Sequence, residues 1–310
     1  EILRDLIRKR FYPRFSRDEV FITDGAKSDI GRLQAFIGSD VVVGMQDPSY
    51  PVYFDGSLIQ KVKDIVLLPC SSKNSFFPDL DKDIDVLYLC NPNNPTGIAY
   101  TKDQLEAIVQ FALNHNILIL YDAAYSGYIM NDNLPKSIYE ISGAEYTAIE
   151  VNSFSKLAGF TGLRLGWTIV PKTLMYQCKT PFLKDFKRYI STVFNGPSNI
   201  VQAGGCSVLS EEGMKGVQKN IDSVMQAAHF LKSYFTKKGY DVFGGENAPY
   251  LWINTPEKYS WDVFQDFLEK RNVIVTPGVG FGPSGEYFFR LSAFISLPDL
   301  KRFIIDKRLI

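Results

Sequence analysis

VNSFSKLAGFTGLRLGW, residues 151–167, is the stretch of this 310-residue chain that decides most about its fold. An apolar, strand-like run ends in Ser153 and Ser155, and Lys156 follows directly. Three glycines and Arg164 come next. Serine hydroxyls, small residues and an arginine suit a tight pocket for a phosphate anion, and a lysine held beside that anion becomes a reactive amine. The alternative interpretation is a solvated lysine after a strand.

Short apolar strands alternate with helical patterns through the first 170 residues. The expected strands are Val20–Thr23, Val41–Met45, Ile65–Leu68, Val86–Cys90, Ile117–Tyr121, Ala148–Asn152 and Leu165–Val170. Helices expected between them include Lys27–Ile37 and Lys102–Asn114. This alternation predicts an α/β fold with a mainly parallel sheet and helices on both faces. Ligands of such sheets bind at the carboxyl ends of the strands.

The later part of the chain has a different pattern. Residues 197–237 are largely helical with one polar face. Beyond them we expect strands at Tyr250–Ile253, Val273–Val275 and Tyr287–Leu291, and helices at Trp261–Lys270 and Leu300–Lys307. The pattern predicts a large domain over residues 1–195, then a connecting helix and a small α+β domain over residues 196–310.

Composition narrows the class of protein. Hydrophobic residues make up 45% and charged residues 22%, which predicts a packed core. Lys plus Arg and Asp plus Glu both number 34, so no charge excess favours nucleic acid or a membrane surface as a partner. The widely spaced Cys70, Cys90, Cys178 and Cys206 form no CxxC motif and favour core thiols in a cytoplasmic protein. Two histidines, neither near a cysteine, do not favour a metal site.

Asp122 ends the apolar run Ile117–Tyr121, and Tyr125 follows three residues later. A carboxylate at the end of a buried strand is costly unless it meets a cationic partner. The alternative for Asp122 is the N-cap of a helix. Arg290 lies in the apolar strand YFFRLS, where it is costly to bury without an anion, unless that strand lies at a solvent edge.

Three more segments follow expected strands. The loop NPNNPTG, residues 91–97, cannot be helical, and its Asn94–Pro95 bond is a candidate for the cis form. DGAK precedes an expected helix, where the backbone N–H groups of Ala26 and Lys27 suit a phosphate. DPSYP places Tyr50 just after a strand. Taken alone, these segments also fit an ordinary turn, a helix start and a packed tyrosine.

In this order, and over nearly the whole chain, the segments resemble the fold-type I aminotransferases, which use pyridoxal 5′-phosphate. The resemblance implies that Lys156 carries the cofactor and moves the substrate proton, that Asp122 pairs with the pyridine nitrogen, and that Tyr125 contacts the ring oxygen. The cofactor contacts that it implies are Ala26, Lys27, Tyr50, Asn94, Asp122, Tyr125, Ser153, Ser155, Lys156 and Arg164. The substrate contacts that it implies are Lys27, Asn94, Asn195 and Arg290.

The resemblance is closer still to one subgroup, the LL-diaminopimelate aminotransferases, through DGAKSDI, QDPSYPVY, SFSKLAGFTGLRLGW, VFNGPSNIVQAG and GGENAPYLW. In that subgroup Asn195 reaches the site of the neighbouring subunit, which implies a homodimer with shared active sites. The implied reaction is the reversible conversion of LL-2,6-diaminopimelate and 2-oxoglutarate to tetrahydrodipicolinate and glutamate, in lysine and peptidoglycan precursor biosynthesis. Alternatives are another aminotransferase of this fold, for alanine or aromatic substrates, a lyase, or a silent homologue that only binds or dimerises.

The chain opens with Glu1 in a helical pattern. The family's N-terminal segment, which carries a tyrosine for the partner subunit's phosphate, is not matched by any residue here. We therefore expect the 310 residues alone to bind cofactor poorly or to turn over slowly.

Overall fold

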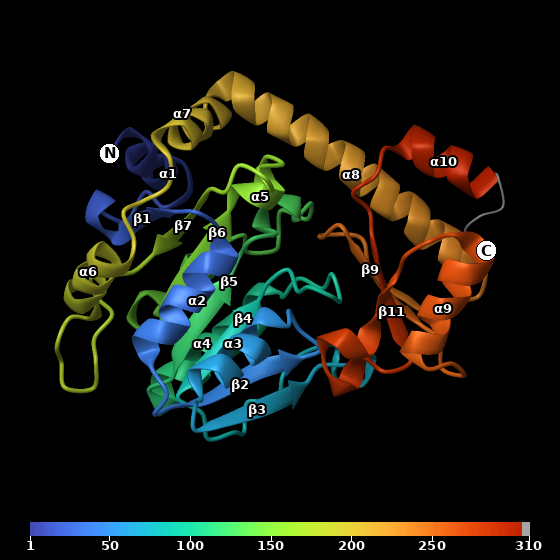
Figure 1. Ribbon diagram of the computed structural model, residues 1–310. Helices are drawn as coiled ribbons and strands as arrows, with labels where there is room; N and C mark the ends of the chain where they lie inside the picture. Colours follow the sequence, from blue (N-terminus) through green and yellow to red (C-terminus); the bar gives the residue numbers. More distant parts are fainter. Residues whose placement is uncertain (306–310) are drawn as a thin grey trace.

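The computed structural model describes residues 1–305, and within them seven strands form a central sheet in the order β1-β7-β6-β5-β4-β2-β3 (Figure 1). Its strands are β1 (Val20–Thr23), β2 (Val42–Asp47), β3 (Asp64–Pro69), β4 (Val86–Cys90), β5 (Leu118–Asp122), β6 (Ala148–Ser153) and β7 (Gly166–Ile169). Strands β2 to β6 pair in parallel, whereas β7 and β1 pair antiparallel. The predicted mainly parallel sheet is confirmed.

The middle strands are buried on both faces, which explains their nearly unbroken apolar sequences. Because side chains alternate along a strand, Leu89 of β4 contacts one layer of helices and Cys90 the other. The helices on the first face are α1 (Ile2–Phe11) and α4 (Lys102–His115), and those on the second are α2 (Ala26–Ile37), α3 (Val52–Gln60) and α6 (Phe182–Val193). Two layers of helices therefore cover the sheet.

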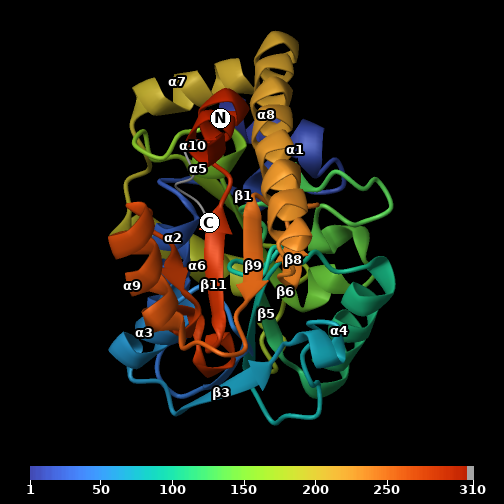
Figure 2. The same cartoon turned by 90° about the vertical axis from the view of Figure 1, so that its right-hand side faces the viewer.

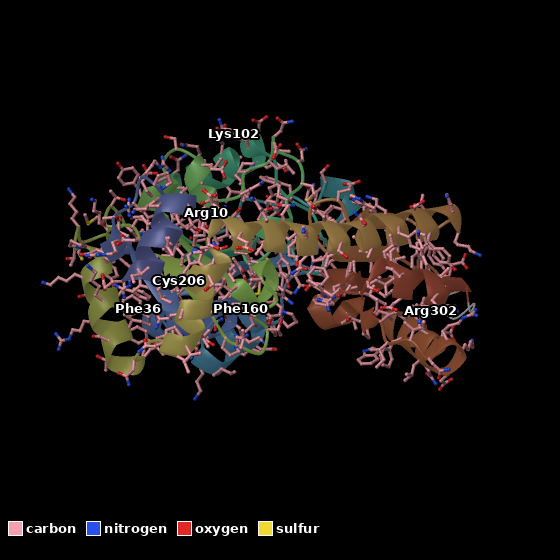
Figure 3. All side chains as sticks on the ribbon, turned by 90° about the horizontal axis from the view of Figure 1, so that it is seen from above. Arg10, Phe36, Lys102, Phe160, Cys206 and Arg302 are labelled. Carbon is pink, nitrogen blue, oxygen red and sulfur yellow. The ribbon has the colours of Figure 1, made fainter. Side chains whose placement is uncertain are left out.

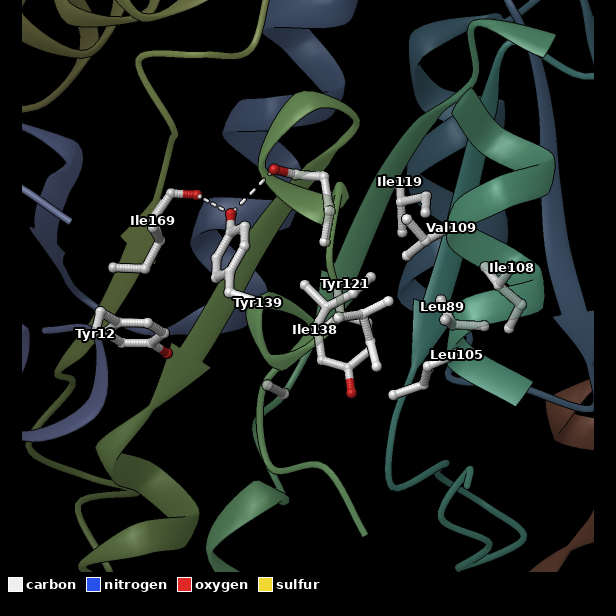
Figure 4. Packing of buried hydrophobic residues seen from close by; sticks show 14 of the residues in the cluster. Tyr12, Leu89, Leu105, Ile108, Val109, Ile119, Tyr121, Ile138, Tyr139 and Ile169 are labelled. Atoms are coloured by element: carbon white, nitrogen blue, oxygen red, sulfur yellow. Dashed lines mark hydrogen bonds between the residues drawn. The ribbon is translucent and has the colours of Figure 1, made fainter. Parts of the chain in front are cut away.

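Helix α4 shows how local sequence and core packing agree. It begins after Thr101, whose hydroxyl accepts the Gln104 N–H at 3.3 Å, while the Gln104 side chain accepts the Thr101 N–H at 2.9 Å. This capping box satisfies backbone donors that the first helical turn leaves unpaired. Figure 4 shows Leu105, Ile108 and Val109 of α4 against the sheet, and burial of each such side chain contributes about 1.5–3 kcal/mol.

A second, smaller sheet lies beyond the central one (Figures 1 and 2). Within the described residues it consists of β8 (Val242–Gly244), β9 (Tyr250–Asn254), β10 (Thr276–Pro277) and β11 (Phe288–Ser292), all antiparallel in the order β10-β11-β9-β8. Its helices are α9 (Ser260–Arg271) and α10 (Leu297–Ile305). The later chain is thus the α+β unit that the sequence predicts.

Two helices join the sheets. These are α7 (Asn199–Val208) and the 27-residue α8 (Glu211–Lys237). Seen from above, α8 runs from the lobe that contains Cys206 to the lobe that contains Arg302 (Figure 3). The predicted domain boundary after residue 195 falls between α6 and α7. Helix α7 lies beyond that boundary but still packs on α1 of the large domain, through Gly205 and Leu3. The boundary therefore stays a prediction.

Some expectations about the elements were wrong. Residues Val273–Val275 form no strand, because the Val273 N–H still donates to the Phe267 carbonyl at the end of α9, and pairing with β11 begins at Thr276. Strand β8 was not predicted. Cys70 and Cys90 are buried thiols, but Cys178 is exposed and is not a core residue.

Helix α10 was expected to run over Leu300–Lys307; it begins at Leu297, and Lys307 lies outside the described residues. Among the helices that the structure describes, none is both long enough and apolar enough to cross a lipid bilayer.

Candidate active site

A cavity of about 460 Å³ opens at the carboxyl ends of the central strands. Its lining residues are Ala26, Lys27, Ser28, Tyr50, Cys90, Asn94, Asp122, Ala124, Tyr125, Ser153, Ser155, Lys156, Thr161 and Arg164. All the residues expected to contact a cofactor are among them. Segments as far apart as residues 26 and 164 thus meet at the edge of a parallel sheet where ligands bind.

The alternation of side chains explains which face of the sheet holds the cavity. Asp122 ends β5 beside Cys90 of β4, and both point to the face that α2 covers. Ser153 ends the neighbouring strand β6 on the same face, since it lies two residues after Val151 in the α2-side core. Polar groups at three successive strand ends therefore converge without any bend in the strands.

One end of the cavity contains groups that commonly bind anions. Ser153 caps the four-residue helix α5 (Phe154–Leu157), its hydroxyl accepting the Ser155 N–H at 3.0 Å. The Ser155 hydroxyl accepts a hydrogen bond from Arg164 Nη1 at 3.1 Å. Helix α2 begins at Ala26 and points its first N–H groups to the same end. Hydroxyls, a guanidinium and a helix N-terminus together favour a phosphate.

Gly25, just before α2, is required by this arrangement. Its φ of 122° lies in a region that other residues rarely adopt, and a Cβ atom there would lie 2.5 Å from Arg164 Nη2. The missing side chain lets the guanidinium approach the end of α2. A positive charge is thus held against a helix N-terminus, where an anion would be bound by both.

Lys156 lies at the centre of the cavity lining, on α5. Its Nζ lies 4.8 Å from the centroid of the Phe294 ring and 5.8 Å from that of Tyr125, and its carbonyl accepts the Tyr128 hydroxyl at 3.0 Å. Burial, together with the charge of Arg290, lowers the pKa of Lys156 below its ordinary value. A lower pKa leaves more of the lysine as the neutral amine, which is the nucleophilic and proton-accepting form.

Asp122 is 5% exposed and has few partners. Its carboxylate accepts the Tyr53 hydroxyl at 2.8 Å and the Ala124 N–H at 3.0 Å. No ion pair to Asp122 occurs within residues 1–305. Burial raises the pKa of Asp122, while these two hydrogen bonds oppose the rise. A cation with an N–H group, placed in the cavity, would offset the cost of burying this charge.

Within residues 1–305, no residue of the small sheet lines the cavity, but Arg290 contacts the cavity residue Asn94. Arg290 of β11 donates from Nη1 to Asn94 Oδ1 at 2.6 Å, and the peptide bond after Asn94 is cis. The Nε–H of Arg290 is buried and has no acceptor among the described residues. The guanidinium therefore keeps a free donor of the kind that recognises a carboxylate.

Comparison with known proteins agrees with this geometry. The sequence model of the family described as aminotransferase class I and II matches residues 3–304. The chain belongs to this family. It is 49% identical over 307 residues to the chloroplastic LL-diaminopimelate aminotransferase of Arabidopsis thaliana, an alignment that covers 94% of this chain. The chain spans only 66% of the length of that plant relative.

Two further relatives give the same result. An LL-diaminopimelate aminotransferase of Protochlamydia amoebophila is 41% identical over 325 residues, covering 98% of this chain and 79% of the relative. The solved structure of L,L-diaminopimelate aminotransferase from Chlamydomonas reinhardtii has a TM-score of 0.95 and 46% identity, covering 99% of this chain and 80% of that one. The expected aminotransferase resemblance and the fold are confirmed.

Some residues of this candidate site were not predicted. Tyr53 bonds Asp122, Tyr250 bonds Tyr125, and Thr161 contributes to the cavity lining. Tyr53 and Tyr250 lie in the segments QDPSYPVY and GGENAPYLW, but nothing in those segments distinguishes a tyrosine at the site from one in the core. Only their contacts, 69 and 125 residues away along the chain, do so.

The predicted roles of Lys27, Tyr50 and Asn195 need a separate test. Lys27 and Tyr50 line the cavity, with Lys27 Nζ 5.6 Å from the centroid of the Tyr50 ring. Asn195 is exposed between α6 and α7 and does not line the cavity of its own chain. Its expected role, across a dimer, stays a prediction.

Proposed function

We propose that this chain transfers amino groups with pyridoxal 5′-phosphate, between LL-2,6-diaminopimelate and 2-oxoglutarate, in lysine and peptidoglycan precursor biosynthesis. The observation that carries the proposal is the single cavity that gathers Lys156, Asp122, Asn94 and an anion site. The names of the relatives, at 41–49% identity, support the choice of substrate.

The lining fits the cofactor group by group. Ser153, Ser155, Arg164 and the start of α2 would hold the phosphate, and Tyr50 would stack on the ring. Asp122, buried without a cation among the described residues, would pair with the protonated pyridine nitrogen. Tyr125 and Asn94 would contact the ring oxygen. Bound there, pyridoxal phosphate supplies an electron sink for the substrate's α-carbon.

The chain's own residues then account for binding and proton movement. Lys156 would hold the cofactor through its side-chain amine. As a free amine, Lys156 would accept the proton of the substrate α-carbon and later donate it again. Asp122 keeps the pyridine nitrogen protonated. Arg290, beside the cavity residue Asn94, would hold the α-carboxylate with its guanidinium.

The second end of the substrate explains the specificity that we propose. LL-diaminopimelate has a distal amine and carboxylate, and these need polar partners such as Lys27 of the same chain and Asn195 of a second copy in a homodimer. A site built for those groups rejects alanine or phenylalanine, which would leave polar groups buried and unpaired. The proposed partners are thus small amino and 2-oxo acids and a second copy of this chain.

The first test is chemical. Purified protein loaded with pyridoxal phosphate should be yellow, and borohydride reduction should fix the cofactor on Lys156, as read by mass spectrometry of its peptides. Lys156→Ala should lose the reduced adduct, whereas Lys27→Ala, which removes the other lysine of the cavity lining, should keep it. An adduct on Lys27 in the unmodified protein would refute the assignment.

The second test concerns the substrate. Transfer to 2-oxoglutarate should be fast from LL-diaminopimelate and at least about 100-fold slower, in kcat/KM, from alanine or phenylalanine. Equal kcat/KM for phenylalanine and LL-diaminopimelate would overturn the substrate but leave the aminotransferase proposal intact. A cytoplasmic location is likewise a proposal, which fractionation of the source cells would test; the Arabidopsis relative is chloroplastic by name.

A further inference from the structure

Tyr250 lies between two groups of the site that come from different sheets. It is the first residue of β9, on the small sheet, and is 4% exposed. Its hydroxyl oxygen lies 2.6 Å from that of Tyr125, which follows the central strand β5. Arg290 Cζ lies 4.5 Å from the centroid of the Tyr250 ring. One side chain therefore contacts both the proposed carboxylate-binding arginine and the proposed ring-oxygen tyrosine.

The hydrogen bond between the two phenols can run in either direction, and the direction matters. Each hydroxyl has one proton to donate. If Tyr125 donates to Tyr250, it has no proton left for a ligand oxygen. If Tyr250 donates to Tyr125, the Tyr125 proton is free to point into the cavity, where Tyr125 is part of the lining.

The position of Arg290 favours the second direction. A cation over the face of a phenol ring draws electron density from it and makes its hydroxyl the stronger donor. Burial raises the pKa of Tyr250, but Arg290 and the bond to Tyr125 oppose that rise. Burial raises the pKa of Tyr125 as well, and there Tyr250 adds to the rise. The guanidinium 4.5 Å from its ring centroid makes Tyr250 the natural donor.

We propose that Tyr250 is a positioning residue, which donates to Tyr125, directs the Tyr125 proton to the cofactor's ring oxygen, and links Arg290 to that oxygen. This inference rests on the proposed function. When a substrate carboxylate pairs with Arg290, the cation's pull on the Tyr250 ring weakens. The hydrogen bond at the ring oxygen then responds to substrate binding across the two sheets.

The decisive variant is Tyr250→Phe, which keeps the ring under Arg290 and removes only the hydroxyl. A donor bond from Tyr125 stabilises the ring oxygen as an anion, and a second bond behind it strengthens the first. In cofactor-loaded protein, the pH midpoint of the visible absorption change should rise by roughly 0.7 units, the shift that one lost hydrogen bond gives. Tyr125→Phe should raise it further.

The double variant separates positioning from packing. If Tyr250 acts through Tyr125, then Tyr250→Phe should produce no further shift of the midpoint in the Tyr125→Phe background. Tyr240→Phe is the matched control, because it removes one hydroxyl from another tyrosine of the small domain that packs edge-on against Phe235, outside the cavity. It should leave the midpoint unchanged.

Kinetics should separate the hydroxyl from the ring. Tyr250→Phe should lower kcat about fivefold with KM for 2-oxoglutarate within about twofold, since the ring under Arg290 remains. Tyr250→Leu should also raise that KM, by up to about tenfold, because Arg290 loses one of its two aromatic contacts and keeps only Phe281. A midpoint in Tyr250→Phe equal to that of the unmodified protein would overturn the inference, as would additive shifts in the double variant.

If the proposed function is wrong, the outcome differs from a failure of the inference about Tyr250. Protein that stays colourless with pyridoxal phosphate contradicts that function, and the tyrosine pair is then judged in unloaded protein. There, Tyr125→Phe and Tyr250→Phe should be non-additive in the urea unfolding equilibrium by about fivefold. Additive effects would show that the two hydroxyls are not coupled and would overturn the inference.

Discussion

Two buried carboxylates lie on neighbouring strands of the central sheet and face opposite sides of it. Asp122 ends β5 on the side of α2, and Glu150 lies in β6 on the side of α1. They are 5% and 1% exposed. Glu150 accepts hydrogen bonds from the Tyr12 and Ser137 hydroxyls, the Ile138 N–H and the Asn152 amide. Both of its oxygens therefore have two donors from the chain itself.

Asp122 is different because one side of it opens on the cavity. It has one hydroxyl and one backbone N–H as donors, from Tyr53 and Ala124. Burial raises the pKa of both carboxyls, that of Glu150 to about 7. Their surroundings nevertheless differ: the described residues give Glu150 four donors and Asp122 only two. Incomplete satisfaction, more than burial, marks the functional carboxylate.

The largest expected effect lies on the Asp122 side. Lys156→Ala removes the amine that we propose as cofactor attachment and proton carrier, and kcat/KM should fall by about 10⁴-fold or more. The matched control is Lys136→Ala on the Glu150 side, where Lys136 lines a separate cavity of about 240 Å³. Its kcat/KM should stay within about twofold of the unmodified protein. An equal loss of kcat/KM in both variants would contradict the functional difference that we propose between the two faces of the sheet.

Neutralising each carboxylate tests the comparison directly. Asp122→Asn keeps the shape but removes the charge that holds the pyridine nitrogen protonated, so kcat should fall about 10²- to 10³-fold with cofactor still bound. Glu150→Gln should change kcat by less than about threefold, measured where both proteins are folded. Near-normal kcat in Asp122→Asn would show that the open carboxylate is not the functional one.

Ionisation of Glu150 should change the free energy of unfolding rather than the activity. The pKa of Glu150 is about 7 when folded, against an ordinary value of 4.5. The folded state thus holds this proton more tightly, and the stabilisation is complete below about pH 4.5 and lost as pH rises through 7. Relative to Glu150→Gln, the unfolding free energy of the unmodified protein should fall by roughly 3 kcal/mol between pH 4 and pH 8.

Urea unfolding of both proteins across that pH range measures this change. Charges elsewhere in the chain titrate alike in the two proteins, so they cancel in the difference. A difference that does not vary with pH would mean that Glu150 titrates at an ordinary pKa when folded.

The smallest effect concerns the hydroxyl that supports Asp122. Tyr53→Phe removes the bond to the carboxylate and should raise the pKa of Asp122 further, lowering kcat about fivefold. Tyr100→Phe is the control, since Tyr100 is equally buried but donates to the Phe76 carbonyl, away from Asp122. It should cost stability and leave kcat unchanged. Equal kcat in both variants would show that the Tyr53 hydroxyl does not contribute to the function of Asp122.

Local sequence predicted most of the elements because each depends on neighbours in the chain. Strand β4 was predicted with its observed ends, and α4 to within one residue, since a continuous apolar run and helical periodicity are local signals. The strand expected at Val273–Val275 failed for a tertiary reason. Its residues are apolar, but the Val273 N–H is hydrogen-bonded to the end of α9. Pairing with β11 begins only at Thr276.

The sequence alone also determined which segments carry the chemistry. Lys156 with its serines, Asp122 at a strand end and the loop of Asn94 each have a local signature, and the resemblance assigned their roles. Whether Asp122 was a helix cap or a site residue could not be decided locally. In the structure no helix begins at Asp122: its carboxylate accepts the Ala124 N–H within a turn, and the next helical turn, Ser126–Tyr128, begins after Tyr125. The helix-cap interpretation was wrong, and the site role of Asp122 stays a proposal.

Only the tertiary structure decided which side chains meet. Tyr250 reaches Tyr125 across 125 residues, and Arg290 reaches Asn94 across 196. Strand order, the packing of helices on each face and the docking of the small sheet determine these contacts. None of these leaves a periodic signal in the sequence, because a buried tyrosine has the same pattern whether it packs in a core or completes a site.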